Sequence, residues 1–416
     1  MKDEIKYLYW LNRVDGIGQK SLLMLMKFVG SAATVFTLSE HDLSWFLNKR
    51  QLTELVKSRE KWDIDGEFEK LKHRKISFYP YGYAGYPEKL LDLPDPPAAL
   101  YVKGSLPEPN TPAVAVIGTR KCSGYGSAMA KQLGLQLAER GISVISGMAR
   151  GIDGIGQRAV CEAGGATFAV LGSGVDVVYP PENIRLYEQI IDRGGIISEY
   201  IPGTEPKASL FPARNRIISG LADAVIVVEA KEKSGTMITV DMALEQGREV
   251  YAMPGRLVDG LSSGCNRLIK QGAGLVLSIE EFIEEFLFSV RQKLVIEMVD
   301  LKNHSEAISK NADRLETGGE KNAGNEKSEK ATETASEKAT TQTATTQTAD
   351  SSFTLSPLTN EENQVLSCLD YIPKSLEQIM ISCPQISYES LLRILITFSL
   401  RGIVGQMGAG SYCRLK

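Results

Sequence analysis

The fold of this chain is decided by residues 113–172, which read AVAVIGTRKCSGYGSAMAKQLGLQLAERGISVISGMARGIDGIGQRAVCEAGGATFAVLG. Short apolar, β-branched runs alternate here with longer segments of helical composition. The same alternation continues to residue 254, and apolar strands separated by helices are typical of a parallel sheet covered on both faces. Because crossover connections are right-handed, the sequence predicts an α/β, doubly wound, Rossmann-like parallel sheet. The predicted strands are 113–118, 142–147, 166–172, 195–200, 224–230 and 249–254, and the predicted helices are 126–140, 152–163, 181–193, 215–221 and 236–246.

Composition places the chain among ordinary globular proteins. Its 416 residues include 43% hydrophobic and 24% charged residues, and this length predicts two to four domains. The formal net charge of −4 argues against a strongly basic protein that binds any polyanion through bulk charge. A contact with nucleic acid must therefore come from a local site.

One break in composition divides the chain. Residues 303–352 contain no aromatic residue and consist largely of Glu, Lys, Ala and Thr-Gln repeats. Such a segment cannot bury enough apolar surface to offset its ordering entropy, so we predict a disordered linker. The expected parts are a helical domain at 1–80, the Rossmann-like domain at 81–290, this linker, and a small domain at 353–416.

The N-terminal part carries a Gly-Ile-Gly turn at Gly16, Ile17 and Gly18 between two apolar helical segments. This pattern is typical of a helix-hairpin-helix or SAM-like domain, in which amides at a helix N-terminus can hold a phosphate. The alternative is a plain helical hairpin, which the small number of nearby basic residues slightly favours. The proline-rich residues 86–112 are expected to form an irregular connection.

We expect a cytoplasmic protein. The longest stretch without charge is 163–175, shorter than the roughly 20 apolar residues that a spanning helix needs. The N-terminus lacks the apolar core of a signal peptide. The six cysteines are scattered without a Cys-x-x-Cys pair, so neither a metal site nor a disulfide framework is expected.

Glycine-rich loops follow several of the predicted strands. In an open parallel sheet ligands bind beyond the carboxyl ends of the strands, and free amides at helix starts favour anions. Arg120 and Arg150 add charge-assisted donors. We predict a phosphate-binding site shared by these loops, although each could also be a tight turn without a ligand. Its candidate residues are Gly118, Thr119, Arg120, Ser146, Gly147, Arg150, Gly151, Ser234 and Gly235.

The loops do not match the common nucleotide-binding motifs. Gly124 and Gly126 are followed by Met129 where the dinucleotide motif Gly-x-Gly-x-x-Gly requires its third glycine. A Walker A sequence is absent as well. We therefore expect no NAD, ATP or other cofactor.

The loop after the fourth predicted strand combines cations with an aromatic residue. Lys207, Arg214 and Arg216 surround Phe211, and Asn215 supplies an amide. Single-stranded nucleic acid is bound by such sets, because cations track phosphates while a ring stacks on a base. The alternative is that Phe211 belongs to the core and that the two arginines are structural.

The sequence offers little support for catalysis. All three histidines lie outside the α/β domain, so no Ser-His or Cys-His pair can form within it. The acids near strand ends are Asp153, Asp176, Glu199 and Glu229. We interpret them as residues that orient loops by accepting amide hydrogen bonds, and we expect a binding protein that is not an enzyme.

These loops, in this order, resemble the DNA-processing protein A family (DprA, also called Smf). The matching segments are 117–126 (IGTRKCSGYG), 146–153 (SGMARGID), 169–180 (AVLGSGVDVVYP), 198–200 (SEY), 211–223 (FPARNRIISGLAD), 227–230 (VVEA), 234–239 (SGTMIT) and 253–273 (MPGR to GCNRLIKQGA). One departure is Gln157, which stands where the family usually has a histidine.

The resemblance implies a cytoplasmic bacterial protein that binds single-stranded DNA and loads the RecA recombinase on incoming strands during natural transformation. It also implies displacement of single-strand-binding protein, strand annealing, and a homodimer formed through the Rossmann-like domain. No membrane partner is implied. The DNA groove of the family maps to Arg120, Arg150, Lys207, Phe211, Arg214 and Asn215.

The C-terminal residues 353–416 resemble the winged-helix domain of many family members. Helices are expected at 359–370, 375–381 and 387–401, followed by a hairpin at 403–414. Five basic and five acidic residues give this segment no net charge, which favours a protein contact or a weak accessory DNA contact over groove reading.

Two other functions compete with the DNA-binding hypothesis. One is a nucleotide-processing enzyme similar to the lysine-decarboxylase-like phosphoribohydrolases, but their Pro-Gly-Gly-x-Gly-Thr motif is replaced here by Pro254, Gly255 and Arg256. The other is a scaffold whose loops bind structural anions only.

Overall fold

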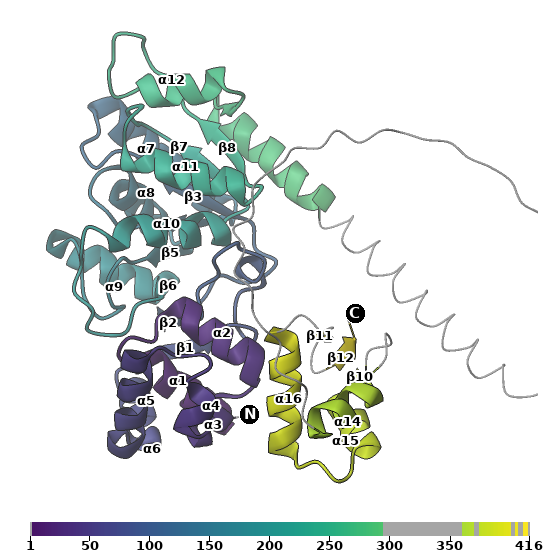
Figure 1. Ribbon diagram of the computed structural model, residues 1–416. Helices are drawn as coiled ribbons and strands as arrows, with labels where there is room; N and C mark the ends of the chain where they lie inside the picture. The colour runs from purple at the N-terminus through teal and green to yellow at the C-terminus, as the bar shows by residue number, and fades with distance from the viewer. Residues whose placement is uncertain (1, 294–359, 370–373, 401–403, 407–410, 415–416) are drawn as a thin grey trace, which may run out of the picture. The chain divides into compact units, whose positions relative to one another are not determined.

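The computed structural model describes residues 2–293, 360–369, 374–400, 404–406 and 411–414. The chain divides into two units, residues 1–304 and 305–416 (Figure 1). The predicted linker, 303–352, lies outside the described residues. Among the residues that the structure describes, no helix is long and apolar enough to span a membrane.

The first unit is built on one nine-stranded sheet in the order β1-β2-β6-β5-β4-β3-β7-β8-β9. The seven strands from β6 to β9 in this order are parallel, and the predicted Rossmann-like α/β fold is confirmed. The strands are β1 (Ser77–Pro80), β2 (Ala99–Gly104), β3 (Ala113–Ile117), β4 (Ser143–Ser146), β5 (Thr167–Val170), β6 (Gly195–Ser198), β7 (Ala224–Val227), β8 (Glu249–Ala252) and β9 (Gly274–Leu275).

One edge of this sheet corrects the sequence analysis. The proline-rich segment 86–112 is not wholly irregular, because it contains β2, which pairs antiparallel with β6 and with β1. Residues 99–102 are buried, and this burial stabilises a strand between flanking prolines. β1 spans Ser77–Pro80 and pairs with β2, so the predicted domain boundary at residue 80 would separate two strands of the same sheet.

Helices cover both faces of the sheet. The side chains of β3 alternate: Val114 and Val116 face the cluster that contains α7, whereas Ala115 and Ile117 face the cluster that contains α10 and α11. This period of two is what a strand buried on both faces requires. The helices are α7 (Gly124–Glu139), α8 (Ile152–Glu162), α9 (Ile184–Arg193), α10 (Leu210–Leu221), α11 (Gly235–Glu245) and α12 (Ser263–Lys270), with η1 (Glu88–Leu90) and η2 (Pro181–Asn183) as single 3₁₀ turns, and residues 279–293 are also helical.

Six helices precede β1 and lie beside β1 and β2 (purple in Figure 1). They are α1 (Lys2–Arg13), α2 (Gln19–Val29), α3 (Ala32–Thr37), α4 (Glu40–Leu43), α5 (Lys49–Lys61) and α6 (Ile64–His73). Gly16, with φ of +81°, makes the predicted turn before α2. At that turn Gln19 accepts a hydrogen bond from the Ala98 amide at 2.6 Å and donates to the Glu199 carbonyl at 3.4 Å. The residue at the start of α2 therefore bonds to the segments next to β2 and β6. Assignment of these helices to the helix-hairpin-helix or SAM-like class stays a prediction.

The described residues of the second unit form three helices and a three-stranded antiparallel sheet in the order β10-β12-β11. Val365, Leu391 and Phe398 are buried in its small core. The three expected helices and the hairpin are present, and assignment to the winged-helix class stays a prediction. The elements are α14 (Asn360–Cys368), β10 (Lys374–Ser375), α15 (Leu376–Ser382), α16 (Tyr388–Leu400), β11 (Val404–Gln406) and β12 (Ser411–Arg414).

Candidate functional site

A pocket lies where the carboxyl ends of the central strands meet the start of α10. It collects residues from four segments that are far apart in the sequence, and we call it the Phe211 pocket. Its lining consists of Arg120, Gly147, Ala149, Arg150, Tyr179, Pro180, Phe211 and Arg214. The structure thus brings together five predicted site residues, namely Arg120, Gly147, Arg150, Phe211 and Arg214.

Phe211 is half-buried and forms the aromatic element of this pocket. The Arg120 guanidinium lies 5.4 Å from its ring centroid, and the ring of Tyr179 packs against it at 5.5 Å with an angle of 34°. Gly172 must lack a side chain here, because a Cβ would approach the Phe211 ring to 2.8 Å. A partly exposed ring among cations can stack on an unpaired base or hold a cation over its face.

The glycine-rich loops that follow β3 (residues 118–123) and β4 (residues 147–151) are hydrogen-bonded at their ends. The Ile152 amide donates to the Thr119 carbonyl at 3.2 Å, and the Thr119 amide donates to the Glu229 carbonyl at 2.8 Å. Gly151 has φ of +73°, and a Cβ there would lie 2.3 Å from the Thr119 oxygen. At Gly118 a Cβ would meet the Ile152 side chain at 2.5 Å. These glycines therefore allow the loops to touch, and Gly118, Thr119 and Gly151 shape the site without lining the pocket.

Arg214 does not form the exposed DNA contact that the sequence predicted. Only 4% of it is exposed, and it donates to the Gly147 carbonyl at 3.2 Å and to the Val170 carbonyl. Burial lowers its pKa to about 10, and the nearby Asp153 carboxylate opposes this shift. A Cβ on Gly147 would lie 2.6 Å from the guanidinium. Because α10 begins at Leu210, five residues earlier than predicted, Arg214 lies on a part of this helix that is buried. Its hydrogen bond to the Gly147 carbonyl holds the loop after β4 in place.

Arg216 is a second correction. It is 9% exposed and forms two hydrogen bonds with the buried Glu199 carboxylate, at 2.7 and 2.6 Å. Its Nε also donates to the Asp95 carbonyl at 2.7 Å. A buried ion pair of this kind is satisfied within the protein, so Arg216 links α10 to β6 rather than facing a ligand. Asn215 is half-buried, and its side-chain oxygen accepts from Arg214 at 3.2 Å.

Among the predicted site residues, the exposed cations are Arg120, Arg150 and Lys207. Arg150 forms an ion pair with Glu182, at the start of the segment that leads into α9. Neither Arg120 nor Lys207 forms an ion pair within the described part of the chain. Both are therefore available to a phosphate. Arg150 can bind a phosphate only if the phosphate replaces the Glu182 carboxylate in its ion pair.

Ser146, Ser234 and Gly235 also lie outside the pocket lining, as do Lys207, Asn215 and Arg216. Ser146 is fully buried and donates to the Val116 carbonyl at 2.7 Å, so its hydroxyl is structural. Ser234 and Gly235 start α11, and the Ser234 hydroxyl donates to the Lys231 carbonyl at 2.9 Å. The strand-end loops therefore do not all contribute equally to one pocket.

Three of the four strand-end acids, Asp153, Asp176 and Glu229, accept hydrogen bonds from loop amides as the sequence analysis expected, whereas Glu199 pairs with Arg216. Glu229 accepts from the amide and hydroxyl of Ser123 at 2.8 and 2.6 Å. Asp153 accepts from the Gly147 amide at 3.2 Å, and burial raises the pKa of Asp153 against the opposing influence of Arg214. Within the described residues, no group of three His, Cys, Asp or Glu side chains is placed to hold a metal ion.

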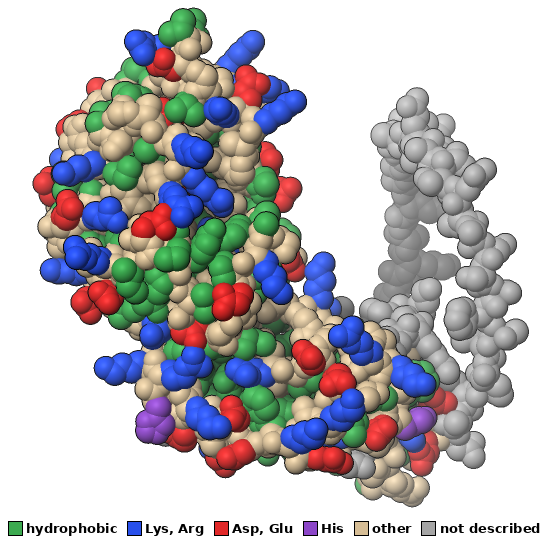
Figure 2. Space-filling view, turned by 90° about the vertical axis from the view of Figure 1, so that its left-hand side faces the viewer, with side chains coloured by type: hydrophobic (Ala, Val, Ile, Leu, Met, Phe, Trp, Pro, Cys, Tyr) green, Lys and Arg blue, Asp and Glu red, His purple; other side chains and the backbone are tan. Residues whose placement is uncertain are grey.

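The surrounding surface has mixed charge. Figure 2 shows Lys and Arg side chains gathered near the middle of one face of the molecule, with hydrophobic side chains beside them and acidic side chains scattered over the same face. The overall charge of this face therefore does not define a binding path for a polyanion, and individual cationic side chains must do so.

Comparison with known proteins assigns this site to a family. The profile of the family described as DNA recombination-mediator protein A matches residues 77–287. DNA processing protein DprA of Streptococcus pneumoniae is 45% identical over 203 residues, which are 49% of this chain and 72% of that protein. Protein Smf of Escherichia coli is 43% identical over 206 residues, 49% of this chain and 55% of that protein. The chain belongs to the DNA recombination-mediator protein A family.

A solved structure agrees with this family assignment. The X-ray structure of DNA processing protein A from Streptococcus pneumoniae is 35% identical to this chain and covers 68% of it, with a TM-score of 0.59. The match covers 98% of that structure. The Phe211 pocket lies within the residues that the family profile matches.

The residue at which this chain departs from the family pattern has a clear structural position. Gln157 is fully buried, and its side-chain oxygen accepts from the Met148 amide at 3.0 Å. Its Nε2 donates to the Phe168 carbonyl at 3.0 Å and to the Thr167 hydroxyl at 3.1 Å. Met148 has φ of +51°, a conformation that costs energy in a residue other than glycine. Gln157 therefore supports the second loop, a role that needs an amide and no titratable group.

Sequence reasoning missed part of the lining of this family site. Tyr179 and Pro180 end the loop after β5, and Glu182 follows them. An aromatic residue at the end of a strand-end loop was a usable signal for Tyr179. The pairing of Arg150 with Glu182 had no signal, because 32 residues separate the two in the chain.

Proposed function

We propose that this chain binds single-stranded DNA at the Phe211 pocket and acts as a recombination mediator that loads the RecA recombinase on incoming strands in natural transformation. In this proposal it acts as a homodimer through the Rossmann-like domain, in the cytoplasm, and performs no chemical step. The observation that carries the proposal is the half-buried Phe211 ring, which packs against Tyr179 and lies 5.4 Å from the guanidinium of Arg120, an exposed residue without an ion pair among the described residues.

This arrangement fits a single strand better than a duplex. A ring can stack only on a base whose face is free, and each base–aromatic stack contributes about 1–3 kcal/mol. Arg120 and Lys207 supply the positive charge that tracks the phosphates. Together they provide what binding without sequence preference needs.

The geometry favours binding over catalysis. The acidic residues at the strand ends accept hydrogen bonds from loop amides or pair with buried arginines, as Glu229 and Glu199 do. Neither His41 nor His73, the histidines in the described part of the chain, lines the Phe211 pocket. A general acid or base must lie within hydrogen-bond reach of a substrate, and the one exposed carboxylate described beside the pocket, Glu182, is held in an ion pair with Arg150.

The mediator role draws its support from the family. The family description names DNA recombination mediation, and the pneumococcal relative is named a DNA processing protein. Two assays address the finer parts: RecA ATPase activity on strands coated with single-strand-binding protein, and light scattering of the full chain for its oligomeric state. Acceleration of the first and a dimer mass in the second are expected.

Binding of labelled poly-dT and of a duplex of equal length, across a salt series, tests the proposal. Poly-dT is expected to bind more tightly, with an affinity that falls as salt rises because bound phosphates release counterions. Equal or tighter binding of the duplex would contradict the proposed function.

A further inference from the structure

A second pocket lies between the helical segment and the loop that follows β6. It has a volume of about 390 Å³, and we call it the Arg13 pocket. Tyr9 and Leu71, each 3% exposed, form its apolar floor. Cationic side chains dominate the rest of its lining, which consists of Arg13, Glu67, Lys70, His73, Arg74 and Pro202.

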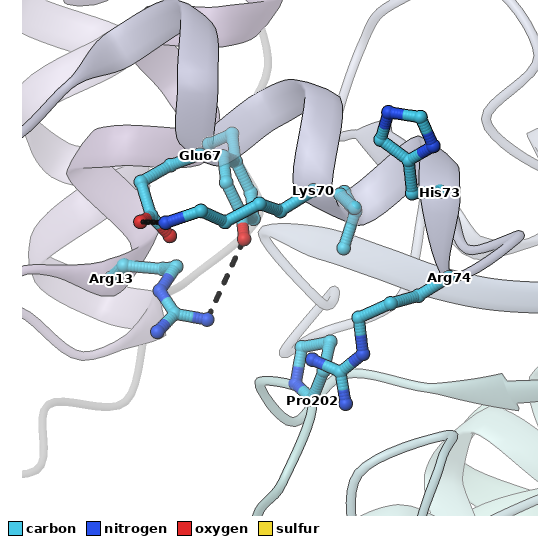
Figure 3. Close-up of a pocket in the computed structure, with 8 residues that line it drawn as sticks. Arg13, Glu67, Lys70, His73, Arg74 and Pro202 are labelled. Atoms are coloured by element: carbon cyan, nitrogen blue, oxygen red, sulfur yellow. Dashed lines mark hydrogen bonds and ion pairs between the residues drawn. The ribbon is translucent and has the colours of Figure 1, made fainter.

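The basic side chains surround one space. Arg13, at the end of α1, and Arg74, just after α6, approach it from opposite sides, with Lys70 above them (Figure 3). Pro202 lies beside the Arg74 guanidinium, and His73 is turned away from the other labelled side chains. Such convergence of guanidinium groups is the arrangement that binds an anion.

Two of these cations already have carboxylate partners. Lys70 pairs with Glu67 at 2.6 Å, and Arg74 pairs with Asp176. Arg13 forms no ion pair within the described ranges. Its guanidinium lies 5.3 Å from the Trp62 ring centroid and makes a long 3.5 Å hydrogen bond to the Tyr9 hydroxyl. One positive charge therefore remains without a carboxylate in this pocket.

Two chain segments lead from the Arg13 pocket to the Phe211 pocket. Asp176, in the loop after β5, pairs with Arg74 and accepts from the Gly203 amide at 2.7 Å. Only three residues further along the same loop, Tyr179 lines the Phe211 pocket, a separation of at most about 11 Å in an extended chain. The loop that contains Pro202 leads to α10, which carries Phe211 nine residues further along the chain. The two pockets are thus neighbours along the edge where the parallel strands end.

We propose that the Arg13 pocket binds a phosphodiester of the same single strand whose other nucleotides occupy the Phe211 pocket. The inference rests on the proposed function and extends the binding path onto the helical segment. A phosphodiester fits because the lining combines the Arg13 guanidinium, which has no ion pair among the described residues, with the Arg74 guanidinium and the Lys70 ammonium, which neighbouring carboxylates hold in place. Two chain segments connect this pocket to the Phe211 pocket, and we therefore infer that the phosphodiester belongs to the strand bound there.

Strand length provides the test. Fluorescence anisotropy of the full chain is measured with labelled oligo-dT of about 5 and about 20 nucleotides, lengths that bracket a typical single-strand site. Arg13→Gln removes the charge and keeps a long polar side chain over the rings. We expect it to leave the affinity for the short strand unchanged and to weaken the long strand roughly threefold to tenfold. The salt dependence for the long strand is expected to fall by about 0.7, the share of one phosphate.

Three companion variants make the result decisive. Arg140→Gln removes an exposed charge at the end of α7, at the opposite edge of the sheet, and is expected to change neither length. Arg13→Lys keeps the charge and is expected to retain the salt dependence. Arg120→Ala acts in the Phe211 pocket and is expected to weaken both lengths.

The outcomes separate the two proposals. If Arg120→Ala weakens binding while Arg13→Gln matches the wild type at both lengths, the Arg13 pocket is not a strand site and the proposed function stands. Equal weakening of both lengths by Arg13→Gln also overturns the inference, because it indicates a general effect on the fold. If the wild-type chain binds neither strand, the proposed function fails and the inference fails with it.

Discussion

Two pairs of arginines at the same edge of the sheet behave in opposite ways. Arg120 and Arg150 lie on glycine loops and are exposed, whereas Arg214 and Arg216 lie on α10 and are 4% and 9% exposed. The sequence suggests one role for all four, since each stands beside glycine or aromatic residues in a family motif. The element that carries the arginine separates them: a loop tip exposes its cation, and a helix packed on the sheet buries it.

Burial of the second pair has an energetic condition. A charge taken out of water costs several kcal/mol unless hydrogen bonds and an opposite charge compensate it. Arg216 meets this condition through Glu199, and Arg214 through two backbone carbonyls near Asp153. The buried pair therefore stabilises the site, and the exposed pair is free to bind.

Among the variants that test this difference between buried and exposed arginines, the largest expected effect is on the stability of the fold. Arg216→Ala leaves the Glu199 carboxylate, 4% exposed, without its partner. We expect a loss of about 3–5 kcal/mol in the free energy of unfolding, measured by urea denaturation. Arg120→Ala is the matched control, because that side chain is exposed and forms no ion pair among the described residues. A loss below about 1 kcal/mol for Arg216→Ala would show that the buried pair is not structural.

The next effect concerns the aromatic element. Phe211→Ala is expected to weaken binding of poly-dT by about 1–3 kcal/mol with an unchanged salt dependence, because stacking releases no counterions. Since the ring is half-buried, its loss should destabilise the fold by less than the roughly 3–5 kcal/mol that a core phenylalanine costs. A variant that melts much lower yet binds normally while folded would refute the stacking role.

Arg120→Ala is expected to have a smaller and different effect. It should weaken all single strands alike and reduce the salt dependence of log K by about 0.7, because one phosphate contact is lost. Thermal stability should stay close to that of the wild type. Anisotropy titrations at several salt concentrations measure both quantities, and an unchanged slope would remove Arg120 from the phosphate path.

The smallest expected effect is a gain. Glu182→Gln releases Arg150 from its ion pair and removes a negative charge from the pocket rim. Both partners are more than half exposed and screened by solvent, so the gain in affinity for poly-dT should be small. The same titrations detect it, with Glu232→Gln, another exposed carboxylate paired with an arginine, as the control. Weaker binding by Glu182→Gln would mean that the pair positions Arg150 for the strand.

The sequence was sufficient for the sheet domain and for half of its site. Apolar runs such as AVAVI and AVIV predict buried parallel strands because both faces of each strand are covered. The glycines at 118, 147 and 151 were recognisable because close backbone approach requires them. The β2 strand was missed because prolines flank it, and its burial depends on pairing with β6, far along the chain.

The rest of the site depends on three-dimensional contacts. Whether Arg214 or Arg120 faces solvent is set by the start of α10 at Leu210, and helix boundaries are the least certain part of a sequence prediction. The Gln157 contacts with Met148 and Phe168 join different elements, so no local pattern announces them. The Arg13 pocket was also hidden, because the three segments that line it, at residues 9–13, 67–74 and 202, lie more than 50 positions apart in the chain.

Photocrosslinking tests the central claim most directly, because it reports where the strand lies. Oligo-dT that carries 5-iodouracil is bound to the full chain and irradiated, and the attached peptides are identified by mass spectrometry. The account predicts attachment at Phe211 or Tyr179, the two rings that pack together in the pocket. Crosslinks confined to the second unit, residues 305–416, would contradict it.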